Sequence, residues 1–334
     1  MIEESECLNE GLTQTRKGFS FMRNSLKTAE QKVEVRKGKL KKIYQDRSLY
    51  MLVLPSILTI FFFRYLTMPG VLMAFQNFKI FDGIAGSQWV GLDNARKILS
   101  QGALKAAVGN TVFLSIGSLV FSFPCPIFLS LLIIEVQNQK FKKVIQTLSY
   151  LPHFLSWMAI VGLIQLVFGR DGLINDFRMW LGAEERIMYL AQQKNFVPLI
   201  LGTGLWQGLG WSTILHLANL SAINPELYEA AEIDGAGYFQ RLKYITFPHM
   251  MPSIVLQLIF RVGGIFGDNF ELIYGLQNPF IDYEVISTIV MKTGVLNGQY
   301  SLSVCMSLIM ACLSLLLTLG VNWFSKKVTG TGIF

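Results

Sequence analysis

Six apolar stretches constrain the fold of this chain more than any other feature of its sequence. A helix that crosses a lipid bilayer needs about 20 mostly apolar residues. Stretches that meet or approach this length lie at about 49–75, 110–134, 148–168, 196–219, 253–275 and 303–324. We therefore predict an all-α fold, that of a polytopic membrane protein with six transmembrane helices.

The composition agrees with a membrane-embedded body. Of the 334 residues, 52% are hydrophobic and only 15% are charged, whereas an ordinary soluble domain has about 25% charged residues. The net charge of +7 would suggest nucleic-acid binding if it were spread evenly, but 11 of the 29 basic residues lie in the first 48 positions. A charged tail on an apolar body is typical of a membrane topology signal.

The basic residues also predict the orientation of the chain in the membrane, because cytoplasmic segments carry an excess of Lys and Arg. The tail and the loops on its side carry 18 basic residues, and the opposite loops carry nine. We therefore expect both termini in the cytoplasm. The tail, residues 1–48, either lies against anionic lipid headgroups as an interfacial segment or serves only as a solvated topology signal. The first apolar run begins too late for a cleavable signal peptide, so we expect the tail to be retained.

The sequence contains no recognisable catalytic, nucleotide or metal site. It has no G-x-x-x-x-G-K-[ST] phosphate loop, and no nucleophile is patterned with a base. The three histidines, His153, His216 and His249, are far apart and match no metal-binding spacing. The four cysteines form no framework either, since three of them lie in apolar runs. We therefore expect no enzyme activity, no metal and no cofactor in this chain.

One polar segment of 33 residues, 220–252, interrupts the apolar body and is patterned for helix. Asn224 is a good N-cap, and Pro225 suits the first helical position. Apolar residues then recur at helical spacing until Gly235, which is a suitable stop. A second helical stretch, 238–246, is expected to end before Pro248. Together these features predict a rigid cytoplasmic knob.

The surface of this predicted knob suits the docking of another protein. Ala230 and Ala231 would let a partner's backbone approach closely, while Glu229 and Glu232 could pair with its basic residues. The alternative is a solvated helical hairpin without a partner.

The same residues resemble the EAA motif of binding-protein-dependent ABC importer permeases. Six of the seven motif positions and all spacings agree, with Phe247 where the family normally has Leu. The resemblance continues from about residue 45 to the end of the chain and is strongest to the carbohydrate branch, which includes permeases for oligosaccharides from complex polysaccharides. The segments that carry this wider similarity are Ser87–Gly91, Leu151–Trp157, Trp206–Trp211, Phe270–Glu271 and Asn278–Pro279.

The resemblance implies a type I permease fold in a bacterial cytoplasmic membrane and a set of partners. These are a second permease subunit, usually a different chain, two cytoplasmic ATPase subunits that hold ATP and Mg, and an extracytoplasmic sugar-binding protein. This chain would then form half of an oligosaccharide pathway. Transferred residue by residue, the motif assigns coupling to the ATPase to Glu229, Ala230, Ala231, Asp234, Gly235, Ile245 and Pro248.

Polar and aromatic residues inside the apolar stretches are candidates for the sugar pathway, because ionisable residues are costly in a membrane and sugars need both hydrogen bonds and aromatic faces. In the fourth and fifth stretches the candidates are Trp206, Gln207, Trp211, Asp268, Asn269, Glu271 and Tyr274. On a continuous helix Arg261 and Asp268 would share one face. The alternatives are an interfacial aromatic belt or packing for the tryptophans, and structural pairing with Arg261 or with a partner subunit for the carboxylates.

Arg64, in the first stretch, has two interpretations. Its side chain could extend toward the outer face of the membrane, or it could point into the pathway and suit an acidic sugar such as a uronate. A second class of function, an ion-coupled secondary transporter using Asp268, Glu271 and Arg64, would be expected to show inverted repeats and broken helices. The sequence shows no sign of these.

Overall fold

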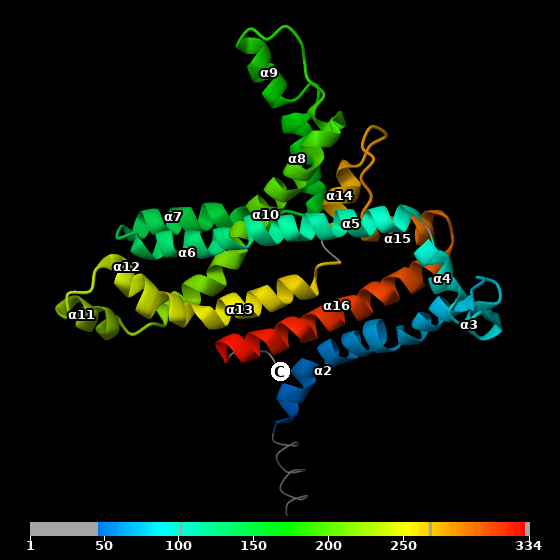
Figure 1. Ribbon diagram of the computed structural model, residues 1–334, viewed down its shortest axis with the longest axis horizontal. Coiled ribbons are helices and arrows are strands. Elements are labelled where there is room, and N and C mark those ends of the chain that lie inside the picture. Colours follow the sequence, from blue (N-terminus) through cyan, green and yellow to red (C-terminus); the bar gives the residue numbers. More distant parts are fainter. Residues whose placement is uncertain (1–45, 101, 267–268, 331–334) are drawn as a thin grey trace, which may run out of the picture. The chain divides into compact units, whose positions relative to one another are not determined.

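The computed structural model describes residues 46–100, 102–266 and 269–330, and most of them lie in helices (Figure 1). The predictions for residues 1–45 and for Asp268 fall outside the described residues. The chain divides into two compact units, Met1–Gly70 and Val71–Phe334. In chain order the elements up to the third apolar stretch are α2 (Arg47–Ile60), η1 (Phe61–Tyr65), η2 (Met68–Phe75), β1 (Gln76–Asn77), α3 (Gly83–Gly86), β2 (Gln88–Trp89), α4 (Asp93–Ser100), α5 (Gly102–Gly117), η3 (Ser118–Ser122), α6 (Pro124–Glu135), α7 (Gln139–Tyr150) and η4 (Leu151–Phe154).

The remaining elements are helical. They are α8 (Trp157–Phe168), α9 (Leu173–Trp180), η5 (Tyr189–Ala191), α10 (Gln193–Ser221), α11 (Pro225–Ile233), α12 (Tyr238–Arg241), η6 (Leu242–Thr246), α13 (Phe247–Gly263), α14 (Phe270–Leu276), α15 (Ile286–Met291), η7 (Lys292–Leu296) and α16 (Tyr300–Thr329).

The prediction of an all-α membrane protein is confirmed. Five helical runs in the described part of the chain are long and apolar enough to cross a membrane: Arg47–Phe75, Gly102–Glu135, Trp157–Trp180, Tyr238–Gly263 and Tyr300–Lys327. The predicted stretch 196–219 lies within α10, which at 29 residues is long enough but contains more polar side chains. With α10 the number of spans agrees with the predicted six.

Two membrane-crossing runs pass through a proline by widening into a π-helical turn. In η3 the amide of Phe123 donates to the Ser118 carbonyl, five residues back, and Pro124 follows. In η6 the amide of Phe247 donates to the Leu242 carbonyl, and Pro248 follows. A proline ring clashes with the carbonyl four residues before it, and the wider turn removes that crowding. The predicted helix end before Pro248 is therefore wrong, since the helix continues to Gly263.

Two other predicted boundaries differ from the structure. The stretch 148–168 begins as the end of α7 and the short turn η4, and the spanning helix starts only at Trp157, where the Ser156 hydroxyl accepts from the Ala159 amide at 3.2 Å. The stretch 253–275 is not one helix. It breaks after Gly263 and resumes at Phe270, and Asn269 before the second helix has a left-handed φ of 56°. Arg261 and Glu271 therefore do not share a continuous helix.

The main hydrophobic core of the second unit surrounds this break. Buried side chains from α8, α10, α14 and the segment before α15 form one cluster, which includes Ile160, Ile200, Leu272 and Val285. The helix α13 packs against α16, and Figure 1 shows the two side by side. The core therefore fixes α14, the second part of the broken span, against α8 and α10.

Candidate functional site

A cavity of about 130 Å³ lies beside the break in the fifth span. Its wall is formed by α5 and η3, α10, the end of α13 and the segment that follows, and the start of α14. The polar side chains that line it are Thr111, Ser115, Ser118, Ser122, Gln207, Arg261, Asn269 and Ser287, and Trp157 adds an aromatic wall. Among the described residues of this lining, Arg261 is the one charged side chain.

Hydroxyl groups along one side of the second span hold the broken end of the fifth. Ser115, Ser118 and Ser122 all face the cavity. The Ser115 hydroxyl donates to the Ile265 carbonyl at 2.7 Å, just past the end of α13. The Ser118 hydroxyl accepts from Nη1 of Arg261 at 3.0 Å. The bond from Ser115 gives the Ile265 carbonyl a partner that the interrupted helix does not supply. The bond to Ser118 fixes the side chain of Arg261.

Two of the predicted pathway residues, Gln207 and Asn269, lie together on this cavity. Asn269 approaches α10 closely: a Cβ atom added at Gly204 would lie 3.3 Å from its Nδ2. Gln207 Nε2 lies at the hydrogen-bond limit, 3.5 Å, from the His153 carbonyl. The cavity therefore presents amides, hydroxyls and a guanidinium within one polar chamber.

The other predicted pathway residues lie elsewhere in the structure. Trp206 lines a separate apolar groove of about 510 Å³ between α8 and α10. Trp211 is half-exposed and stacks on the His153 ring, with centroids 4.6 Å apart. In α14, Glu271 is exposed and Tyr274 stacks on Phe270. Arg64 is exposed in η1, which belongs to the first unit. Their roles in a pathway stay predictions.

The first helix of the predicted knob, α11, begins and ends where its sequence signals indicate. The Asn224 side chain accepts from the Glu226 amide at 3.1 Å and caps α11. At the other end Gly235 has a left-handed φ of 77°, and the Ala236 amide donates to the Ala231 carbonyl at 2.8 Å. This is the arrangement by which glycine terminates helices. The start at Pro225 and the stop at Gly235 are confirmed.

The exposed side of α11 is available for a partner. Glu229, Ala230 and Asp234 are exposed, and so is Ile233, with 87% of its surface accessible. The side chain of Ile233 adds an apolar contact surface beside these small and acidic residues.

The opposite side of α11 is fixed to the base of the fifth span. The Tyr228 hydroxyl lies 2.9 Å from the hydroxyl of Thr246 in η6. Arg241 forms an ion pair of 3.5 Å with Glu232. Ile245 packs on a buried cluster that includes Met250 of α13. A force on α11 would therefore be transmitted directly to α13, although Pro248 itself is exposed.

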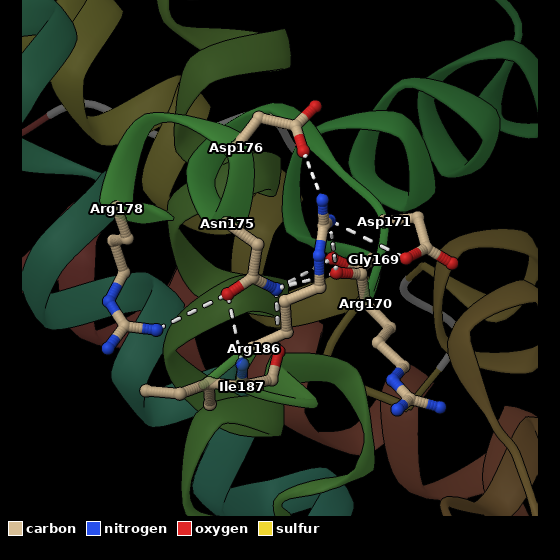
Figure 2. Close-up of polar contacts among 8 residues, drawn as sticks. All are labelled: Gly169, Arg170, Asp171, Asn175, Asp176, Arg178, Arg186 and Ile187. Atoms are coloured by element: carbon tan, nitrogen blue, oxygen red, sulfur yellow. Dashed lines mark hydrogen bonds and ion pairs between the residues drawn. The ribbon is translucent and has the colours of Figure 1, made fainter. Parts of the chain in front are cut away.

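A compact polar cap follows the third span, and Figure 2 shows its contacts. Asn175 is completely buried, and its Nδ2 donates to the carbonyls of Gly169, Arg170 and Ile187 at 2.8–3.1 Å. Its Oδ1 accepts from the Ile187 amide at 2.9 Å. Arg186 adds ion pairs to Asp176 at 2.8 Å and Asp171 at 3.5 Å. The side chain of Asn175 in α9 thus connects the loop that contains Ile187 to the segment between α8 and α9.

Sequence reasoning missed the contact between Arg261 and Ser118 and the role of Asn175. Arg261 could be recognised as costly in a span, but its serine partner lies 143 residues earlier. Asn175 lies in a polar loop where asparagine is common, and no local pattern marks it as buried.

Three comparisons with known proteins agree. The family model described as "Binding-protein-dependent transport system inner membrane component" matches residues 127–330. The polygalacturonan/rhamnogalacturonan transport system permease protein YteP of Bacillus subtilis is 37% identical over 91% of this chain and 95% of its own length. Protein LplB of the same organism is 36% identical over 87% of this chain and 92% of its own. A chain of a bacterial alginate ABC transporter, solved with a periplasmic protein bound to an alginate pentasaccharide, has a TM-score of 0.77 and 33% identity over 88% of this chain and 99% of its own.

Proposed function

The chain belongs to the family of binding-protein-dependent transport system inner membrane components, and on this premise we propose that it imports oligosaccharides. It is a permease subunit of a sugar ABC importer, a transport subunit and not an enzyme, and a multi-pass protein of the cytoplasmic membrane. The proposal adds that it forms half of the translocation pathway and couples to a cytoplasmic ATPase through α11.

The substrate class is supported by the relatives and by the cavity. The name of the relative YteP refers to polygalacturonan and rhamnogalacturonan. A second solved structure is that of a bacterial ABC transporter involved in the import of the acidic polysaccharide alginate. The hydroxyl and amide groups of Ser122, Gln207 and Asn269 suit sugar hydroxyls, and Trp157 offers a face for a sugar ring. We propose that oligosaccharides released from such polymers pass this cavity. Trp206, Trp211, Asp268, Glu271, Tyr274 and Arg64 stay candidates for other parts of the pathway.

The coupling role is supported by the geometry of α11. Its exposed side has small and acidic residues, and its other side is bonded to η6 and α13. We propose that Glu229, Ala230, Ala231, Asp234 and Gly235 contact an ATPase subunit, and that Ile245 and Pro248 carry its movement to the fifth span. ATP and Mg would be held by that partner.

The proposed assembly has four further subunits and a defined orientation. They are a second permease that is a different chain, two ATPase subunits and an extracytoplasmic sugar-binding protein. Both termini of this chain would lie in the cytoplasm, on the side of α11, and the basic tail would lie beside the inner leaflet. The external cap around Asn175 would then face the binding protein.

Copurification tests this proposal. The tagged chain, expressed with its partners, should bring down an ATPase, and Glu229→Lys or Gly235→Pro should lower the yield of that ATPase severalfold. Glu184→Lys is the matched control, because it makes the same charge change at an exposed position in the external cap. Wild-type yield of ATPase with both α11 variants would show that this helix is not the coupling element.

A further inference from the structure

Arg261 holds a permanent positive charge beside the cavity. It lies in the last turn of α13, within a membrane-crossing run, and its side chain lines the chamber. Arginine inside a membrane span is energetically costly. It is found where the side chain faces the protein interior or a water-filled cavity, and there it marks a functional site. The other described residues of the lining are neutral, so none of them supplies a reason for the charge.

The guanidinium is oriented but largely unoccupied. Nη1 donates to the Ser118 hydroxyl at 3.0 Å. In the part of the chain that the structure describes, this is the one hydrogen bond made by Arg261, and none of the ion pairs there includes it. A guanidinium has five N–H donors. Most of them are therefore available to a ligand, while the serine fixes the direction of the group.

The chemistry of the chamber distinguishes between two classes of sugar. Neutral sugars present hydroxyl groups, which Ser115, Ser122, Gln207 and Asn269 can bind without any charge. A planar guanidinium adds a paired set of donors whose geometry matches a carboxylate. Such a group gains most when the ligand is an anion, because its hydrogen bonds to an ionised oxygen are about twice as strong as those to a neutral hydroxyl group.

We propose that Arg261 binds a carboxylate of the sugar in this cavity and selects acidic oligosaccharides over neutral ones. The inference rests on the proposed function, since it requires that oligosaccharides pass the cavity. Ser118 is a positioning residue that aims the guanidinium. The acid-binding role that the sequence suggested for Arg64 is thereby assigned to an arginine that lines the chamber.

The test compares two sugars that differ only at the carboxyl groups, which are ionised in one sugar and methyl-esterified in the other. The complete importer, with its binding protein and ATPases, is reconstituted in proteoliposomes, and ATP-driven uptake is measured for a uronic acid trisaccharide and for the same trisaccharide with its carboxyl groups methyl-esterified. Arg261→Gln should lower uptake of the acid by about tenfold to a hundredfold, the loss expected for one hydrogen-bonded charge contact. It should change uptake of the ester by less than about twofold. The binding protein is the same in both assays, so the ratio of variant to wild type reports the permease.

Two further variants keep the result interpretable. Arg261→Lys keeps the charge but not the paired donors, so it should recover part of the acid uptake that Arg261→Gln loses. This comparison uses the acid alone, so it can be made even if the binding protein does not bind the ester. Arg96→Gln removes a charge from an exposed position on α4 and should transport both sugars like wild type. Assembly is checked by the yield of copurified ATPase.

Three results would overturn the inference. Equal losses for both sugars in Arg261→Gln, reproduced by Asp268→Asn, would indicate that Arg261 serves a structural pair. A glutamine variant that imports the acid like wild type would exclude the contact. A wild-type importer that carries the ester and not the acid would also contradict it, while leaving the proposed function intact. If the wild type carries no oligosaccharide of either kind, the proposed function itself fails.

Discussion

The guanidinium of Arg261 donates a hydrogen bond of 3.0 Å to the hydroxyl of Ser118. This contact joins the last turn of α13 to the π-helical turn η3, and both residues line the same cavity. The π turn exists because Pro124 follows it, so a proline in the second span helps to determine where the serine presents its oxygen.

The first prediction concerns this contact. Ser118→Ala removes the acceptor of the Arg261 donor without changing the charge of the cavity, so the guanidinium loses its orientation. We expect the KM for uptake of an acidic oligosaccharide to rise by about threefold to tenfold, the effect of one ordinary hydrogen bond, because the guanidinium keeps its charge and loses only its orientation. Initial uptake rates over a range of sugar concentrations measure it. An unchanged KM would show that Arg261 does not depend on Ser118.

The second prediction concerns the external cap. Asn175→Ala leaves three carbonyls and an amide without their side-chain partner (Figure 2). Buried polar groups without partners cost about 1–3 kcal/mol each when water cannot reach them, so we expect the free energy of unfolding to fall by about 3 kcal/mol. Thermal unfolding in detergent measures the change. Asn297→Ala, at an exposed position, should leave the unfolding temperature within a degree or two of wild type.

The third prediction concerns pH. Burial raises the pKa of Glu284, but hydrogen bonds from Lys292 and Thr288 and the charge of Lys292 outweigh it, and the pKa lies below its usual value of 4.5. Glu284 precedes α15, outside the predicted spans. A lowered pKa contributes stability that is present above the unfolded value and is lost as the pH falls through the folded value. The unfolding temperature of the wild type should therefore fall below about pH 4.5 more steeply than that of Glu284→Gln. Parallel curves for the two proteins would contradict it.

The fourth prediction concerns the packing of α10 on α7. A Cβ atom at Gly210 would collide with the carbonyl of Ser149, which is backbone and cannot rotate away. We expect Gly210→Ala to destabilise the protein by about 3 kcal/mol, because one helix must shift. Gly202→Ala, in the same helix, places its methyl group in open space and is the matched control. Equal unfolding temperatures for the two variants would show that the helices do not approach closely at Gly210.

Local signals in the sequence predicted the parts of the structure that depend on neighbouring residues. The start of α11 at Pro225 follows from the Asn224 cap, and its end follows from Gly235. The apolar stretches predicted the spans because the membrane imposes length and hydrophobicity on each segment separately.

Non-local features could not be predicted in the same way. The polar residues between Gly263 and Phe270 lie between two apolar runs, so the whole stretch reads as one span in the sequence. The Ile265 carbonyl in the break accepts from Ser115, which belongs to another span. The cavity likewise unites Gln207 and Asn269 through packing of distant helices. Such contacts depend on the whole fold.

The break in the fifth span also bears on the ion-coupled alternative. Broken helices are typical of secondary transporters, and the sequence was expected to lack them. One is present. The family match and the relatives nevertheless place this chain among ABC importer permeases, so the break is a feature of this permease and does not indicate an ion site.

The dependence of transport on the partner ATPase tests the proposed function most directly. Proteoliposomes that contain both permease subunits and the loaded binding protein are assayed for oligosaccharide uptake with and without the ATPase subunits. We predict uptake only when the ATPases and ATP are both present, and its loss in Glu229→Lys. Uptake that persists without the ATPases, and is unchanged in Glu229→Lys, would contradict coupling through α11.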